Sequence, residues 1–257
     1  MVNVPEMLPI LSTLFLIAFL VFLILLILGR RRLFVHPGFL VIFFLVYFID
    51  NLAITLANQF PGLQIVPNHT WEGFLICGWS GKAYSILAVL LLLYLLRSML
   101  SPGELGLTLH QNQGSFIPSM LVILLITAWS SLIGSRSPKG APDPLVLAYL
   151  ALMPGLNEEL VYRGVLPACL ERIFPSKWSL ASARMGWGAI VTTILFGLLH
   201  GLWLDEHLLL HANFVWIRNA LISGFIFAWL RGRTGSLVMP VIAHGAWDFF
   251  LFLFRML

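Results

Sequence analysis

Charged residues are scarce in this sequence of 257 residues. Asp, Glu, Lys and Arg together make up only 10% of it, whereas a soluble domain carries about a quarter. Hydrophobic residues account for 60%, and the mean hydropathy is +0.95. This composition excludes an ordinary soluble domain and indicates a polytopic membrane protein. The formal charge of +4 comes from basic residues scattered among apolar runs, so it does not indicate nucleic-acid binding.

Cysteine and several catalytic motifs are also nearly or wholly missing. The two cysteines, Cys77 and Cys169, have no metal-binding spacing, and we expect them near opposite faces of the membrane, which argues against a disulfide between them. The chain has no G-x-S-x-G, no phosphate-binding G-x-x-x-x-G-K-[ST] and no H-E-x-x-H. These absences argue against a serine hydrolase, a P-loop nucleotidase and the commonest zinc protease.

Long apolar runs are what the sequence does contain. At about 20 residues per span they predict an all-α, polytopic transmembrane helix bundle of about eight spans. We expect these spans near residues 8–29, 39–59, 74–96, 116–134, 145–168, 186–203, 214–230 and 236–254. Residues 170–185 are more polar and could form a short interfacial helix. The whole chain, 1–257, is predicted to be one integral membrane domain.

The distribution of basic residues predicts how the bundle is oriented. Arg30, Arg31 and Arg32 close the first span, and most other basic residues fall in loops on that same side. Since cytoplasmic loops are enriched in Lys and Arg, the N-terminus is predicted to lie outside. We expect a multi-pass protein of a prokaryotic cytoplasmic (inner) membrane.

Ionisable residues inside the predicted spans call for a partner or a function, because each costs at least about 2.5–3.5 kcal/mol at the bilayer centre. The segment "PGLNEELVYRGVL", residues 154–166, holds Glu158, Glu159 and Arg163. Positions four apart share a helix face, so Glu159 and Arg163 could neutralise each other. Glu158 points about 100° away, toward Tyr162, and has no partner in its own helix. Glu158 is therefore the candidate free carboxylate.

Two further spans carry polar groups near their middle. "FGLLHG" places Phe196 and His200 on one face, and "HGAWDF" places His244 and Asp248 four apart. Each alone is compatible with packing: His200 as a satisfied buried histidine, and His244 with Asp248 as a helix-stabilising hydrogen bond. Together they predict one shared intramembrane cavity. Lys82 and Asp50 lie in other spans and could pair across helices as a structural contact.

A carboxylate and an imidazole facing one cavity can hold and deprotonate a water molecule. A hydrogen-bond donor is then needed where the attacked carbonyl oxygen becomes negative. His244 can donate, and Asp248 can orient it or donate directly if protonated. With no nucleophilic serine or cysteine in a suitable context, the predicted reaction is peptide hydrolysis by activated water.

These residues also carry a family resemblance. "EELVYR" matches E-E-x-x-x-R, "FGLLH" matches F-x-x-x-H and "HGAWD" matches H-x-x-x-[ND]. In order and spacing, residues 145–250 resemble the CAAX-protease and bacteriocin-processing (CPBP, or Abi) family of intramembrane glutamic endopeptidases, which includes the Ras-converting CAAX endopeptidases. Residues 1–144, the N-terminal helices, resemble no particular family and could wall the path of the substrate.

The resemblance implies a role for each matching position. Glu158 would be the general base that activates water, with His200 as its partner. His244 and Asp248 would stabilise the oxyanion.

Glu159 and Arg163, with Tyr162 and Phe196 beside them, would shape the site. Asp248 departs from the Asn of the prenyl-protein proteases, and an ionised Asp would repel an oxyanion.

The resemblance implies a membrane-associated protein or peptide substrate: a C-terminal tail, a prenyl-protein-like chain or a peptide precursor. It implies no cofactor. Two alternatives stay open. One is a zinc metalloprotease with ligands Glu158, His200, His244 and Asp248, residue types that suit zinc. The other is a non-catalytic membrane scaffold or immunity protein.

Overall fold

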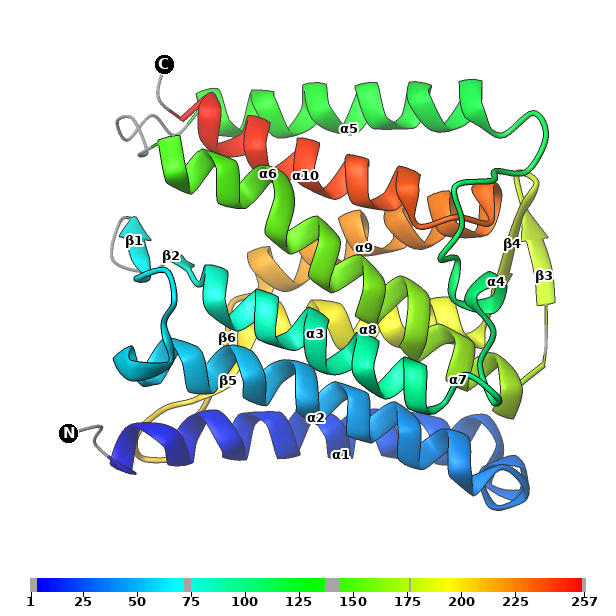
Figure 1. Cartoon of the computed structure of the whole chain (residues 1–257), viewed down its shortest axis with the longest axis horizontal. Coiled ribbons are helices and arrows are strands. Elements are labelled where there is room, and N and C mark those ends of the chain that lie inside the picture. The colour runs from blue at the N-terminus through cyan, green and yellow to red at the C-terminus, as the bar shows by residue number, and fades with distance from the viewer. Residues whose placement is uncertain (1–3, 72–74, 137–143, 176, 256–257) are drawn as a thin grey trace.

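A computed structural model describes residues 4–71, 75–136, 144–175 and 177–255. The apolar runs form helices that lie roughly along one direction, with both termini at the same end of the bundle (Figure 1). We call this the termini end, on the left of Figure 1, and the opposite one the far end. The helices are α1 (Val4–Val35), α2 (Pro37–Gln59), α3 (Trp79–Leu95), α4 (Pro102–Leu105), α5 (Phe116–Ser135), α6 (Pro144–Glu159), α7 (Leu166–Ile173), α8 (Trp187–Gly201), α9 (Phe214–Thr234) and α10 (Val238–Leu253).

The prediction of an all-α polytopic bundle is confirmed. Within the described residues, five helical segments are long and apolar enough to cross a membrane: Met7–Val35, Pro37–Gln59, Phe116–Ser135, Pro144–Ile173 and Phe214–Thr234. Three shorter apolar helices, α3, α8 and α10, fall where the other expected spans lie. The chain crosses from one end to the other with each of these segments (Figure 1).

The irregular elements are short and lie between the helices. A 3₁₀ turn, η1 (Pro61–Leu63), follows α2, and a π-helical turn, η2 (Leu160–Val165), joins α6 to α7. The strands form three antiparallel two-stranded hairpins: β1 (His69–Trp71) with β2 (Leu75–Cys77), β3 (Lys177–Leu180) with β4 (Ala183–Gly186), and β5 (Leu202–Leu204) with β6 (Leu210–Ala212). The expected interfacial helix over 170–185 is wrong, because α7 ends at Ile173 and β3–β4 follows.

Helix ends follow local capping chemistry. The Asn213 side chain accepts a hydrogen bond from the Trp216 backbone N–H at 3.1 Å and begins α9. The same helix ends at Gly235, whose φ of 74° is the left-handed conformation that favours glycine. Ser101 and Glu104 form a capping box on the short helix α4 at the far end.

The segment α6–η2–α7 is the centre of the bundle. In its most apolar stretch 61% of the residues are buried, against 22–33% for the other four long spans. The largest apolar core packs around this segment from α1, α2 and α8. The charged residues that the sequence places here are therefore surrounded by protein on most sides.

Candidate active site

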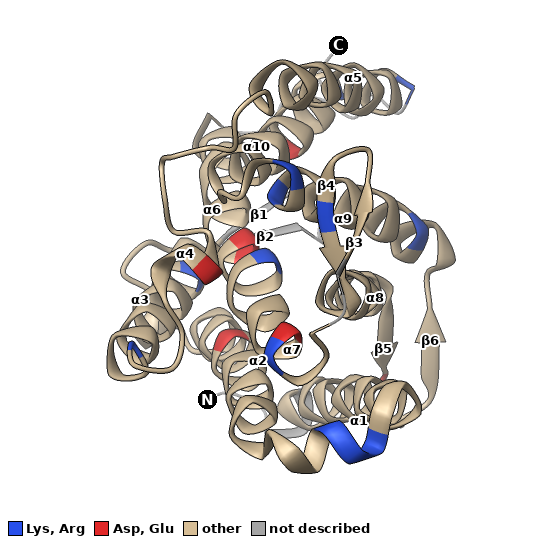
Figure 2. Cartoon of the chain, turned by 90° about the vertical axis from the view of Figure 1, so that its right-hand side faces the viewer, with Lys and Arg blue, Asp and Glu red and all other residues tan. Residues whose placement is uncertain are grey.

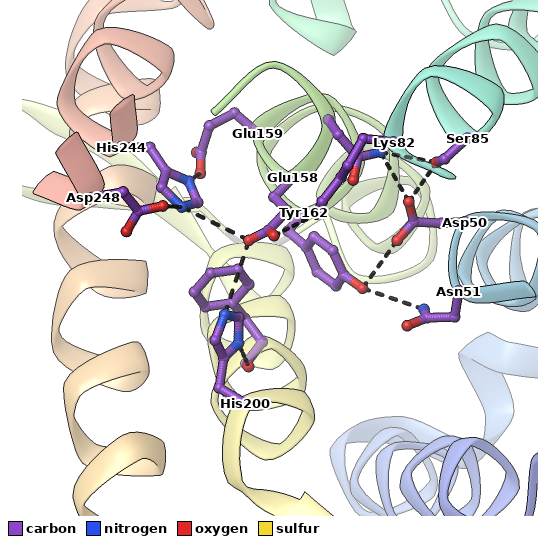
Figure 3. A network of polar contacts seen from close by, with 12 residues as sticks. Asp50, Asn51, Lys82, Ser85, Glu158, Glu159, Tyr162, His200, His244 and Asp248 are labelled. Carbon is purple, nitrogen blue, oxygen red and sulfur yellow. Dashed lines mark hydrogen bonds and ion pairs between the residues drawn. The ribbon is translucent and has the colours of Figure 1, made fainter. Parts of the chain in front are cut away.

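Four elements, α6, η2, α8 and α10, bring the predicted site residues together (Figure 3). The end of α6 carries Glu158 and Glu159, and η2 carries Tyr162 and Arg163. Helix α8 carries Phe196 and, in its last turn, His200, and α10 carries His244 and Asp248.

Two glycines let α6 and α10 approach closely. A Cβ on Gly155 would lie 2.8 Å from the carbonyl oxygen of Val241, and a Cβ on Gly245 would collide with the carbonyl oxygen of Ala151. Only a residue without a side chain fits this backbone contact at either position. The contact sets His244, beside Gly245, against the turn that holds the two glutamates.

The π-helical turn begins directly after the two glutamates. At its end the backbone N–H of Leu166 donates to the carbonyl of Val161, five residues earlier. Such turns are rare and occur mostly as single-turn bulges, often at functional sites. Within this turn Arg163 still reaches back to Glu159, with Nη1 3.1 Å from Oε1.

The two oxygens of Glu158 have different surroundings. Oε1 lies 2.6 Å from Nζ of Lys82, which reaches it from α3. Oε2 is buried and has no hydrogen-bond partner among the described residues. It faces Nε2 of His244 at 3.8 Å and Nε2 of His200 at 4.0 Å. These separations exceed a direct hydrogen bond and suit one bridging water molecule.

Lys82 contacts the site more directly than its sequence context predicts. Among the described residues its ion pair is with Glu158, not with the expected partner Asp50. A Lys within an apolar run is a visible signal, but its partner depends on helix rotation, which the sequence does not specify. The ammonium offsets the charge of Glu158 and so lowers the cost of burying a carboxylate here.

The orientation of His200 follows from its other nitrogen. Nδ1 lies 2.7 Å from the carbonyl oxygen of Phe196, which can only accept, so Nδ1 carries the proton in this contact. In the neutral ring Nε2 is then an acceptor that faces Glu158. The Phe196 ring packs against the imidazole with 4.2 Å between ring centroids.

His244 is held by Glu159. Its Nδ1 lies 2.7 Å from Glu159 Oε1, and its ring stacks on Phe227 at 4.9 Å between centroids. Asp248 lies 3.5 Å from Nε2 on the other side of the ring, too long for a strong hydrogen bond. Glu159 thus makes the closer contact with His244, and the orienting role expected of Asp248 stays a prediction.

Arg163 is clamped behind Glu159. Its guanidinium lies 4.2 Å from the centroid of the Phe196 ring and 5.4 Å from that of Phe227, which is a cation–π arrangement. A Cβ on Gly224 would lie 2.9 Å from Nη2, so the side chain leaves no room there. The expected Glu159–Arg163 ion pair is present and almost fully buried.

A second polar cluster, the Asp50 cluster, lies next to Glu158 (Figure 3). Asp50 Oδ1 accepts hydrogen bonds from Ser85 Oγ at 2.5 Å and Asn157 Nδ2 at 2.9 Å. Oδ2 accepts from the Tyr162 hydroxyl at 3.3 Å, and Asn51 donates to that hydroxyl at 3.4 Å. Tyr162, expected to shape the site, therefore contacts it through its ring on Phe196, while its hydroxyl belongs to the Asp50 cluster.

A cavity of about 760 Å³ opens beside the site, and we call it the site cavity. His200, His244 and Asp248 are among its polar lining residues, and Leu199 and Trp247 are among its apolar ones. Cavities of this size commonly hold peptide-sized or drug-sized ligands. The arrangement can therefore receive an apolar chain with one polar bond placed at the imidazoles.

A separate cavity of about 540 Å³, the far cavity, lies at the far end. Arg163 lines it together with Arg172, Arg184 and Arg231. The site cavity and the far cavity thus lie on opposite sides of the Glu159–Arg163 pair.

A metal site was the alternative drawn from the same side chains. Over the described ranges, no three His, Cys, Asp or Glu residues are placed to hold one ion together. The Glu158 oxygen nearest α3 already has the Lys82 ammonium at 2.6 Å. The zinc alternative stays a prediction, which the chelation experiment below addresses.

Comparison with known proteins agrees with the motifs. Residues 140–250 match the family model described as type II CAAX prenyl endopeptidase Rce1-like. The chain has no significant match among curated proteins or among solved structures. The matched segment carries every site residue of α6, η2, α8 and α10. The segment that holds the candidate site is thus similar to the Rce1-like type II CAAX prenyl endopeptidases.

Proposed function

We propose that the protein is a glutamic-type intramembrane endopeptidase in which Glu158 activates a water molecule. The observation that carries this proposal is the unpartnered oxygen Oε2, buried yet facing two imidazole nitrogens at 3.8 and 4.0 Å. A buried carboxylate oxygen without a hydrogen-bond partner destabilises the folded protein, so its presence here indicates a functional role.

The water molecule would donate one hydrogen bond to Glu158 Oε2 and the other to His200 Nε2. Both atoms are acceptors in this arrangement, so the water oxygen is polarised toward a nucleophile. When it attacks the peptide carbonyl carbon, Glu158 takes its proton. As the C–N bond then breaks, Glu158 returns that proton to the departing amine. Atoms and protons balance without a cofactor.

His244 supplies the donor for the oxyanion. Since Nδ1–H points at Glu159, the ring can donate from Nε2 only as an imidazolium. Carboxyl groups of Glu158, Glu159 and Asp248 all lie within 4 Å of its nitrogens and favour that positive charge. Asp248 would thus act through the charge of His244 and not by donating to the oxyanion.

The test compares protein ends in membranes of cells that express the wild type, Glu158→Gln or Glu206→Gln at matched levels. Glu206 is the control because it is a carboxylate in an exposed loop, with a side chain 83% exposed. We expect new polypeptide termini with the wild type and Glu206→Gln and none with Glu158→Gln.

If all three profiles agree and each form rescues a null strain, the protein is a scaffold and the protease proposal fails. Metal dependence is tested on the same membranes. Loss of the new termini on chelation, with stoichiometric zinc in the purified protein, would replace the water mechanism with a metal-dependent one.

A further inference from the structure

The site cavity opens at one end of the bundle. Its wall includes Ile133 near the end of α5, Val215 and Trp216 at the start of α9, and Arg255 just after α10. All of these helix ends lie at the termini end (Figure 1). His200 itself is in the last turn of α8, which ends there too. A peptide therefore reaches the imidazoles from the termini end.

The opposite end carries most of the positive charge. Eight of the chain's twelve arginines lie at the far end: Arg30, Arg31, Arg32, Arg97, Arg172, Arg184, Arg231 and Arg233. Figure 2 looks onto this end and shows Lys and Arg gathered along its helix ends, with a prominent group on α1. Arg136, Arg218 and Arg255 lie toward the termini end, and Arg163 lies between the two ends.

This asymmetry orients the cavity in the membrane. The positive-inside rule puts the arginine-rich far end in the cytoplasm. We infer that the site cavity opens on the non-cytoplasmic face and takes an exported, membrane-anchored polypeptide whose scissile bond is reached from outside. This inference rests on the proposed function for its substrate and on the charge distribution for its direction. It excludes a cytoplasmic lipidated tail as the substrate.

The cavity wall adds a constraint on that substrate. Apart from its polar residues, it is lined mainly by Leu, Ile, Val, Phe and Trp side chains, which include Trp216 of α9 and Trp247 of α10. Such a wall favours apolar residues next to the cleaved bond. The substrate class is thus an exported chain with an apolar segment near its membrane anchor.

The membrane face on which the site cavity opens can be measured without any substrate. Cys77 is replaced by Ser, and Cys169 is kept because its side chain is fully buried. One cysteine is then introduced in each cavity wall, as Asn219→Cys in the site cavity or Ala189→Cys in the far cavity. Both positions are half-buried and make a matched pair. A membrane-impermeant maleimide is applied to intact spheroplasts and to permeabilised membranes.

We expect Asn219→Cys to be labelled in intact spheroplasts and Ala189→Cys only after permeabilisation, a difference of at least tenfold. The reverse pattern, or equal labelling of both, would overturn the inference. Exposed positions outside the cavities, Glu206→Cys at the termini end and Gln113→Cys at the far end, report orientation alone. If Glu206→Cys is labelled but Asn219→Cys is not, even in permeabilised membranes, the site cavity is not the route by which a substrate enters. The inference is then wrong.

A second readout uses the termini found with the wild type. We expect them to fall in segments of exported proteins on the non-cytoplasmic side. Because the labelling pattern does not depend on catalysis, its failure is separate from failure of the proposed function. Outward labelling with no wild-type-dependent termini would reject the protease and keep the orientation. New termini only in cytoplasmic tails would reject the substrate class.

Discussion

Two polar clusters lie side by side in this bundle, and they differ in how completely their charged groups are hydrogen-bonded. In the Asp50 cluster both carboxylate oxygens accept hydrogen bonds from neighbouring side chains. In the cluster around Glu158, oxygens of Glu158 and Glu159 and nitrogens of Arg163 lack hydrogen-bond partners among the described residues. One of these oxygens faces the imidazoles that line the site cavity. Complete hydrogen bonding fits a structural carboxylate, and an incomplete set at a cavity fits a reactive one.

The largest effect is expected for Glu158→Gln. Losing a general base typically costs about 10²–10⁴-fold in rate, and the amide can still accept from Lys82, so the fold should persist. The measurement is the rate at which a wild-type-dependent terminus appears, together with the melting temperature in detergent. Wild-type rates in this variant would place the chemistry elsewhere.

Gly245→Ala tests the close backbone contact between α10 and α6. The new methyl group meets the Ala151 carbonyl, which cannot move aside without shifting α6. Overpacking of this kind costs about 1–3 kcal/mol, and activity should fall with it because His244 shifts from Glu159. The matched control is Gly38→Ala, whose Cβ would have no neighbour closer than 3.8 Å. Equal melting temperatures for the two variants would refute the close contact.

Asp50→Asn should act on stability more than on catalysis. The new amide group points a donor at Ser85, Asn157 or Tyr162, which now donate to the carboxylate. Leaving buried donors unpaired costs about 1–3 kcal/mol. We expect a lower melting temperature and less than a tenfold fall in activity per folded molecule. A fall as large as that of Glu158→Gln would make Asp50 part of the catalytic machinery.

The smallest effect is expected outside the membrane, at Glu104. Burial acts to raise the pKa of Glu104, but hydrogen bonds from Ser101 and the nearby Arg172 outweigh it and lower the pKa. A lowered pKa in the folded state stabilises the protein above the ordinary Glu pKa of about 4.3, and this contribution is lost as pH falls. At pH 7 the free energy of unfolding of the wild type should exceed that of Glu104→Gln by about a few tenths of a kcal/mol. The difference should vanish in acid; a difference that grows in acid would mean the sign is wrong.

Much of this arrangement could be predicted because the relevant signals are local. Hydropathy marks each span, and Glu158, His200 and His244 stand out as polar residues inside apolar runs. His200 and His244 line one cavity and Glu158 faces both imidazoles, because the three residues lie at similar depth in three spans. The catalytic roles themselves stay predictions.

Contacts between helices could not be predicted in the same way. That Lys82 pairs with Glu158, and that Glu159 rather than Asp248 holds His244, depends on how helices are rotated against each other. The π-helical turn shifts that rotation within one span and has no composition signal of its own. The hairpin at 177–186 was missed because aromatic and basic residues suit an interfacial helix equally well.

Arg163 has a consequence for the membrane as an electrical insulator. It faces the far cavity, and its partner Glu159 holds His244, which faces the site cavity, so two hollows approach each other across one ion pair. A continuous chain of water at this point would conduct protons and drain the gradient across the membrane. A fixed guanidinium wedged between two phenyl rings repels cations and breaks such a chain. The ion pair that holds His244 thus also separates the two cavities.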